Sequence, residues 1–168
     1  MKWMIIVLIM MSLIGSMMWV MPTARQKYQA ALRLHAKKEG FRVQLERITL
    51  PRAKGEMEGE TTNVTSYRLT RKSRDKSQRT QHTPWTAVRV ESLANLGLPE
   101  GWSWLLGEKS LSESQLALLT DVIAQMPGDV TAIESSPVEV GVFWQEEGGE
   151  TALAEIKTQL ERLLDANF

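Results

Sequence analysis

Residues 130–144 read VTAIESSPVEVGVFW, and this stretch decides the fold class of the chain. Its two halves, Val130 to Glu134 and Val138 to Trp144, are rich in the β-branched and aromatic residues that favour strands. The segment Ser135-Ser136-Pro137 between them carries turn-forming residues. In the second half, apolar side chains recur at every other position and so share one face. The stretch therefore predicts two strands connected like a hairpin.

Elements of both kinds are expected on either side of these strands. Apolar and polar residues alternate from Phe41 to about Leu50, and further strand-like runs cover 64–71 and 85–90. Helical spacing of apolar residues covers 23–39 and 151–166. The order lacks the regular βαβ alternation of a parallel sheet. It predicts an α+β domain with a mainly antiparallel sheet and about three helices.

The third helix has the clearest signals at its ends. Ser112 and Gln115 have the spacing of a capping box, and Pro127 follows the last apolar position. The apolar positions expected to be buried on this helix are Leu116, Leu119, Ile123 and Met126. The last helix is expected to bury Leu153, Ile156, Leu160 and Leu163.

An apolar segment precedes this domain. From Trp3 to Met21, only Ser12, Gly15 and Ser16 are not strongly apolar. A helix of this length spans roughly 28 Å, which is close to the thickness of a hydrocarbon core. The sequence therefore predicts a transmembrane anchor over 1–22, a basic juxtamembrane helix over 23–40 and an α+β domain over 41–168.

The flanks of the segment predict its orientation. Trp3 and Trp19 lie near its ends, where aromatic rings favour the membrane interface, and Arg25 and Lys27 follow it. The positive-inside rule then puts the N-terminus outside and the domain in the cytoplasm, as in a single-pass protein of the bacterial inner membrane. A cleaved signal peptide is the alternative, but Val20 to Ala24 lacks a small-x-small cleavage site.

Charge is divided unevenly between the two halves of the chain. Residues 1–92 hold 17 basic and 7 acidic side chains, a balance of +10, and residues 93–168 hold 3 and 13, a balance of −10. Two interpretations stay open: the basic half faces an anionic surface, or the halves pair with each other inside the fold. The densest basic cluster consists of Arg68, Arg71, Lys72, Arg74, Lys76 and Arg79.

This basic cluster has three interpretations. It could contact anionic lipid, contact an acidic partner surface, or form a solvated loop. Nucleic acid is disfavoured as a partner because the cluster contains no aromatic side chains on which bases could stack.

Catalytic and cofactor chemistry finds little support in the sequence. The chain has no cysteine, and its two histidines, His35 and His82, lie far apart. No phosphate-binding, dinucleotide-binding or zinc-protease motif occurs. The run around Ser103 begins like a nucleophile elbow but has Leu105 where the second glycine belongs. No catalytic, cofactor-binding or metal-binding residue is therefore assigned, and no cofactor is expected.

Carboxylates leave one enzymatic alternative open. An anchored enzyme acting on a small molecule or a lipid headgroup would require Asp121, Glu134, Glu139 or the region of Ser103 to converge with an arginine or lysine. Three other acids, Glu146, Glu147 and Glu150, flank a glycine turn and are expected in solvent or in the first turn of the last helix.

One aromatic segment has two interpretations. Trp102, Trp104 and Leu105 either close the core or form an exposed patch that contacts a membrane or a membrane-protein partner. Leu106 belongs to the same segment, and core packing is favoured for all four side chains, because large aromatics dominate small cores.

Three stretches of the chain carry a resemblance to known proteins. The run from Met21 to Leu45, together with Ser66-Tyr67-Arg68-Leu69 and Leu98-Pro99-Glu100-Gly101-Trp102, resembles uncharacterised single-pass inner-membrane proteins of gammaproteobacteria. The first quarter of the chain is also similar in layout to YajC, the small accessory subunit of the bacterial preprotein translocase, although the long acidic second half departs from it. The resemblance implies a membrane compartment and supplies no catalytic residue.

These observations together predict the function class. The chain is expected to be a membrane-anchored, non-enzymatic accessory or scaffold protein of an inner-membrane complex. Its expected partners are the lipid bilayer and a membrane protein, with anionic lipid as a further candidate.

Overall fold

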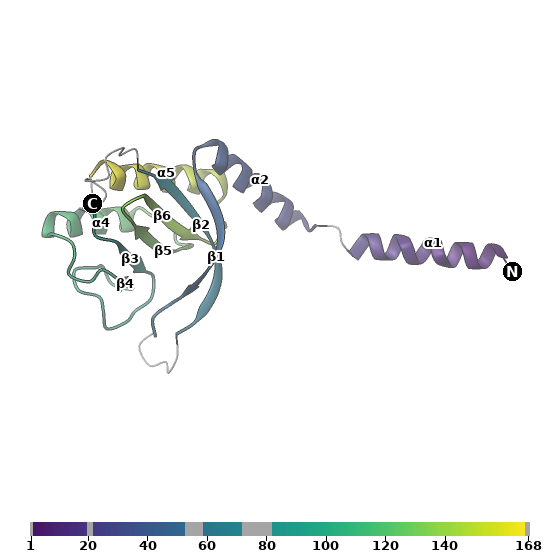
Figure 1. The fold of residues 1–168 in the computed structure, drawn as a ribbon, viewed down its shortest axis with the longest axis horizontal. Coiled ribbons are helices and arrows are strands. Elements are labelled where there is room, and N and C mark those ends of the chain that lie inside the picture. Colours follow the sequence, from purple (N-terminus) through teal and green to yellow (C-terminus); the bar gives the residue numbers. More distant parts are fainter. Residues whose placement is uncertain (1, 20–21, 53–58, 72–81, 167–168) are drawn as a thin grey trace. The chain divides into compact units, whose positions relative to one another are not determined.

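The computed structural model describes residues 2–19, 22–52, 59–71 and 82–166. The chain divides into two units, 1–32 and 33–168. The first contains helix α1 (Lys2–Trp19) and the beginning of helix α2 (Ala24–Lys38) (Figure 1). Thr23 caps α2, since its Oγ1 accepts from the Gln26 N–H at 3.3 Å and its own N–H donates to Gln26 Oε1 at 2.9 Å.

The described helices correct the expected topology. Helix α1 has 18 residues. Within the described ranges, no helix combines the length and the apolar character needed to cross a membrane. The expected transmembrane anchor over 1–22 is therefore wrong. The expected single-pass inner-membrane localisation, with the N-terminus outside and the domain in the cytoplasm, depended on this anchor and is wrong as well.

Four residues are expected at a membrane interface only because of that span. Trp3 lies in α1 with an exposed side chain, and Trp19 is the last residue of α1. Arg25 and Lys27 are exposed in the first turns of α2. Their expected contact with a membrane interface depended on a transmembrane span that the described residues do not form.

The second unit is an α+β fold around one six-stranded sheet, antiparallel throughout (Figure 1). The strands follow the order β1-β2-β6-β5-β3-β4 across the sheet. Their bounds are β1 (Arg42–Thr49), β2 (Thr61–Thr70), β3 (Trp85–Val88), β4 (Ser103–Leu106), β5 (Val130–Ser135) and β6 (Glu139–Trp144). The α+β class and the antiparallel sheet agree with the expectation from the sequence, and β5 and β6 form the expected hairpin.

Strand β4 is not expected from the sequence. It has only four residues and follows a segment rich in glycine and proline, so its period-two pattern is too short to detect. It pairs with β3 on one side. On its other side the Trp104 N–H donates to the Ala94 carbonyl at 2.6 Å, so the preceding segment covers part of the sheet edge.

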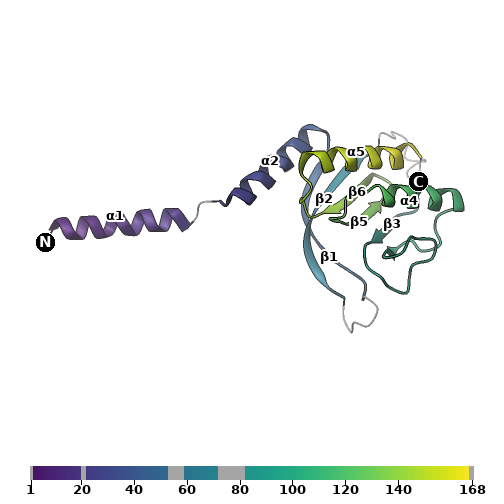
Figure 2. The same ribbon diagram turned by 180° about the vertical axis from the view of Figure 1, so that it is seen from behind.

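Helices α4 (Glu113–Ala124) and α5 (Gly149–Asp165) lie next to each other on one face of the sheet (Figures 1 and 2). The capping box that begins α4 is confirmed, because Ser112 accepts from the Gln115 N–H and the Gln115 side chain accepts from Ser112. Helix α5 buries the expected stripe of Leu153, Ile156, Leu160 and Leu163.

The helix-covered face contains the aromatic core. Tyr67 of β2 lies beside Trp144 of β6, with ring centroids 5.2 Å apart, and beside Phe41 at 5.9 Å. Trp85 and Trp104 meet edge to face at 6.1 Å. Edge-to-face rings of this kind add about 1 kcal/mol each to the free energy of unfolding. The core thus ties the central strands β2 and β6 to the β3–β4 end of the sheet.

The other side chains of these strands point to the opposite face of the sheet. A small apolar cluster there consists of Ile48, Val64, Val88, Ala132 and Phe143. Arg68 adjoins it, with its guanidinium carbon 5.7 Å from the centre of the Phe143 ring. No helix of the described residues packs on this face, so polar side chains gather on it.

Candidate functional site

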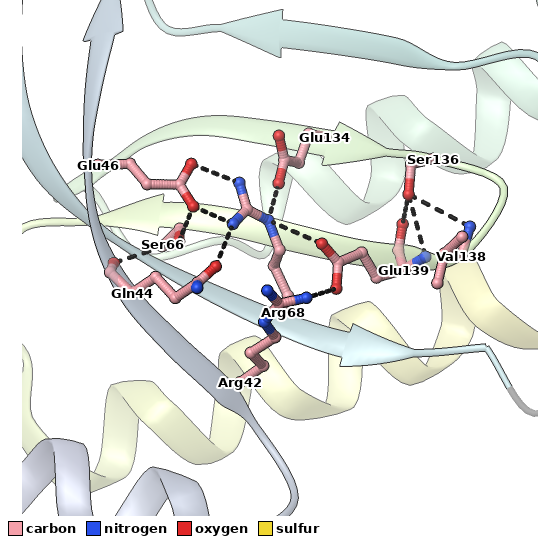
Figure 3. Close-up of polar contacts among 9 residues, drawn as sticks. All are labelled: Arg42, Gln44, Glu46, Ser66, Arg68, Glu134, Ser136, Val138 and Glu139. Atoms are coloured by element: carbon pink, nitrogen blue, oxygen red, sulfur yellow. Dashed lines mark hydrogen bonds and ion pairs between the residues drawn. The ribbon is translucent and has the colours of Figure 1, made fainter.

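Arg68 is the centre of a polar cluster on the helix-free face of the sheet (Figure 3). Strand pairing places it opposite Arg42 on β1 and opposite Gly141 on β6. A Cβ atom on Gly141 would lie 2.6 Å from Arg68 Cγ. Glycine at position 141 therefore leaves the space through which the Arg68 side chain runs across the sheet. The Arg68 cluster consists of Arg42, Gln44, Glu46, Ser66, Arg68, Glu134 and Glu139.

Three carboxylates surround the Arg68 guanidinium. Glu46 accepts from both terminal nitrogens, with Nη2 to Oε2 at 2.7 Å and a second bond from Nη1 to Oε1. Arg68 Nε donates to Glu134 Oε1 and lies 3.4 Å from Glu139 Oε1. Two-point contact of this kind is the geometry in which a guanidinium binds a carboxylate most strongly. The carboxylates come from strands β1, β5 and β6, so one cation joins three strands.

The electrostatics of the cluster favour the charged forms of its central pair. Hydrogen bonding from Arg68 lowers the pKa of Glu46 below its ordinary value, although partial burial opposes this. Hydrogen bonding to Glu46 raises the pKa of Arg68 in turn. Arg42 adds a second cation, 3.5 Å from Glu139 Oε2. A permanently charged guanidinium moves no protons, so Arg68 is suited to holding strands together rather than to acid–base catalysis.

A second polar cluster is buried beneath the helix-covered face. Glu146 follows β6 with a positive φ of 64°, and 1% of its side chain is exposed. Arg33 of α2 donates to both of its oxygens, at 2.7 Å and 2.9 Å, and the Tyr67 hydroxyl donates to Oε1 at 2.7 Å. Arg33 also donates to Thr65 Oγ1 at 3.1 Å. The carboxylate thus fixes the end of α2 to the sheet.

The burial of Glu146 differs from the expectation and shifts the pKa values of the groups that bond to it. The expectation that Glu146 lies in solvent is wrong, because the turn after β6 directs its side chain to Arg33 and Tyr67. Burial, followed by the hydrogen bond to Glu146, raises the pKa of Tyr67 strongly. Hydrogen bonding to Glu146 also raises the pKa of Arg33.

The Tyr67 hydroxyl should therefore stay protonated for as long as the protein is folded. In a Tyr28→Phe variant Tyr67 is the sole tyrosine, so tyrosinate absorbance reports on it alone. The raised pKa stabilises the fold below about pH 10, the ordinary value for tyrosine, and this contribution is lost as pH rises further. We expect tyrosinate to form only together with unfolding, followed by circular dichroism. Reversible ionisation near pH 10 in the folded protein would contradict this geometry.

The structure divides the expected basic cluster. Arg68 is part of the Arg68 cluster, and Arg71 is buried at the end of β2. Arg71 donates from Nη2 to Ser135 Oγ at 2.7 Å and from Nε to the Ser136 carbonyl at 3.0 Å, and burial lowers its pKa. Lys72, Arg74, Lys76 and Arg79 lie outside the described residues.

Ion pairs connect the two oppositely charged halves of the chain. Arg33 of the basic half pairs with Glu146 of the acidic half, and Arg68 pairs with Glu134 and Glu139. At these positions, basic side chains from residues 1–92 therefore pair with acidic side chains from residues 93–168 inside the fold.

The residues required by the enzymatic alternative converge only in part. Glu134 and Glu139 meet at Arg68. Asp121 lies elsewhere and pairs with Arg162 of α5 at 2.5 Å, which lowers the pKa of Asp121. Ser103 Oγ donates to the Val90 carbonyl at 2.7 Å and accepts from the Ser92 N–H at 2.8 Å. Each of these groups thus takes part in a bond within the fold.

The described histidines and acids form no metal site. His35 lies in α2, and His82 precedes β3, where burial lowers its pKa. Across the described ranges, no group of three or more histidine, aspartate or glutamate side chains could hold a metal ion.

The segment around Trp102 and Trp104 shows which of its side chains are available to a partner. Both tryptophans are 4% exposed and belong to the core, whereas Leu105 is 42% exposed. Leu106 is exposed too, so the expectation of core packing is wrong for the two leucines of this segment. Leu93 and Leu96 are also exposed, and no pattern in the sequence singles them out. The leucine patch consists of Leu93 (94% exposed), Leu96 (56%), Leu105 (42%) and Leu106 (54%).

Hydrogen bonds place the two parts of the leucine patch next to each other. Trp104 donates its backbone N–H to the Ala94 carbonyl at 2.6 Å and its indole N–H to the Leu96 carbonyl at 2.9 Å. The segment with Leu93 and Leu96 therefore runs along the outer edge of β4, which carries the other two leucines. The indole is buried, so its bond to Leu96 is shielded from water.

Comparison of the chain with known protein families, with curated proteins and with solved structures found no match.

Proposed function

We propose that this protein is a non-enzymatic accessory protein that binds a protein partner through the leucine patch. The observation that carries this proposal is the concentration of exposed large apolar side chains at one end of the sheet. Large apolar side chains that are exposed close together on a folded domain are typical of interaction sites, and hydrogen bonds hold the two leucine-bearing segments side by side. Fully burying an exposed leucine side chain contributes about 1.5–3 kcal/mol, so covering Leu93, which is 94% exposed, is by itself a useful part of a binding free energy.

The backbone beneath the leucine patch is well fixed. Ser103 and Trp104 bond to the segment that precedes β4, and the Arg89 guanidinium lies 4.9 Å from the centre of the Trp102 ring. Arg89 also donates to the carbonyls of Val130 at 2.8 Å and Pro127 at 3.0 Å. A surface held in this way loses little conformational entropy when a partner binds. This supports a binding role for the patch.

The patch can be tested by affinity purification of a tagged chain with and without its leucines. We expect a Leu93→Ser/Leu106→Ser double variant to retain the fold, because both side chains are exposed, and to capture its main partner at least about tenfold less well. Val138→Ser is the matched control, since Val138 is 45% exposed and directly precedes β6, which β5 and β3 separate from β4. Equal capture by the double variant and the control would contradict the proposal.

A further inference from the structure

Among the described residues, the outer edge of strand β1 is a further surface without a partner. The Leu50 N–H donates to the Glu60 carbonyl at 2.8 Å, which fixes the alternation of the β1–β2 ladder. Even-numbered residues of β1 therefore point their backbone groups toward β2. Val43, Leu45 and Arg47 point theirs outward, and no hydrogen bond between described residues uses these outward groups.

The two edge strands of the sheet, β1 and β4, differ in whether another segment of the chain bonds to their outer side. At β4 the chain covers its own edge through the bond from Trp104 to Ala94. At β1, eight residues pair with β2 in continuous register without a bulge or a proline. Edge strands of this regular kind can add another strand unless charges or bulges prevent it. The charges of β1 have both signs, so they can also complement a second copy.

Strand geometry restricts how two copies of β1 could pair. In an antiparallel pair, opposite residues have the same hydrogen-bonding direction, so a two-fold axis passes through a pair of identical residues. An axis at Gln44 places Arg42 opposite Glu46 of the second copy, twice. It also places Val43 opposite the exposed Leu45, twice. An axis at Glu46 or Arg47 would instead bring like charges together.

We propose that the protein forms a two-fold symmetric dimer in which the β1 strands of two copies pair antiparallel about Gln44. The outward N–H and C=O groups of Val43 and Leu45 would bond across the axis and join two six-stranded sheets into one. The Arg42 side chain is 60% exposed and lies 3.5 Å from Glu139, so it can turn toward Glu46 of the other copy. This inference is independent of the leucine patch, which lies at the opposite edge of the sheet.

A cysteine scan tests this register, because the chain has no cysteine of its own. Gln44 would form a non-hydrogen-bonded pair with its counterpart, with Cα atoms about 4.5 Å apart, which suits a disulfide. We expect full-length Gln44→Cys to crosslink to a dimer under mild oxidation much faster than Leu45→Cys, Arg47→Cys or the exposed helical control Ser114→Cys. Association through the apolar side chains of α1 would give no preference for position 44.

The strength of association gives an independent readout. We expect sedimentation of the wild-type chain to show a concentration-dependent dimer. In Leu45→Pro the outward N–H is lost from each copy while the β1–β2 ladder keeps its bonds, so dimerisation should weaken by about tenfold or more. Monomers at every concentration, or crosslinking that peaks at a position other than 44, would overturn the proposal.

Discussion

Replacing Arg68 with methionine should lower the free energy of unfolding by about 3 kcal/mol at neutral pH, because three carboxylates would lose the cation between them. The effect should depend on pH in a defined direction. Glu46 has a lowered pKa in the folded protein, so its contribution is present above its ordinary value of 4.5 and is lost as pH falls through the lowered value. The difference between wild type and variant should therefore shrink below about pH 4.5.

Urea unfolding at a series of pH values measures this prediction. Arg42→Met is a matched control, because Arg42 belongs to the same cluster but is 60% exposed on its side chain. It should cost about 1 kcal/mol or less, as exposed ion pairs do. A loss of similar size in the two variants would show that Arg68 is no more than a surface charge.

Replacing Glu146 with alanine should cost about 3 kcal/mol. The change leaves the buried Tyr67 hydroxyl and the Arg33 guanidinium without their shared acceptor. Glu146 has a positive φ, which glycine adopts at little cost and alanine does not. A Glu146→Gly variant should therefore lose slightly less stability than Glu146→Ala. Thermal or urea unfolding measures the effect.

Two variants separate the causes of this loss. Glu155→Ala alters an exposed acid of α5 and should change stability by less than about 0.5 kcal/mol. Glu146→Gln keeps an acceptor for Tyr67 but removes the charge facing Arg33, so its stability should fall between that of the wild type and that of Glu146→Ala. If Glu146→Ala were as stable as Glu155→Ala, the carboxylate would not be what fixes α2 to the sheet.

Local patterns in the sequence predict most elements of the domain. The capping box of Ser112 and Gln115 and the apolar spacing of α5 both lie within a few turns of helix, where side-chain periodicity is a strong signal. Strand β4 escapes prediction because its four residues directly follow a segment rich in glycine and proline, so no longer alternating run marks them as a strand. Helix α1 lies where the apolar run predicts a helix.

The clusters are harder to predict because they depend on strand order. Glu46 and Glu134 meet at Arg68 because β6 inserts between β2 and β5, an arrangement that no local pattern encodes. The burial of Glu146 is hidden for a similar reason, since its partners Arg33 and Tyr67 come from distant parts of the chain. The exposure of Leu93 and Leu106 likewise depends on an end of the sheet that only the strand order defines.

The most direct measurement of the proposed binding role is site-specific photo-crosslinking of the full-length chain in the cells that make it. A photoreactive residue at position 93 or 106 should give one main crosslinked protein, whereas the same residue at position 138 should not. That result would place a partner on the leucine patch itself. Crosslinking that is equal at all three positions, or confined to position 138, would contradict a partner-binding role for the patch.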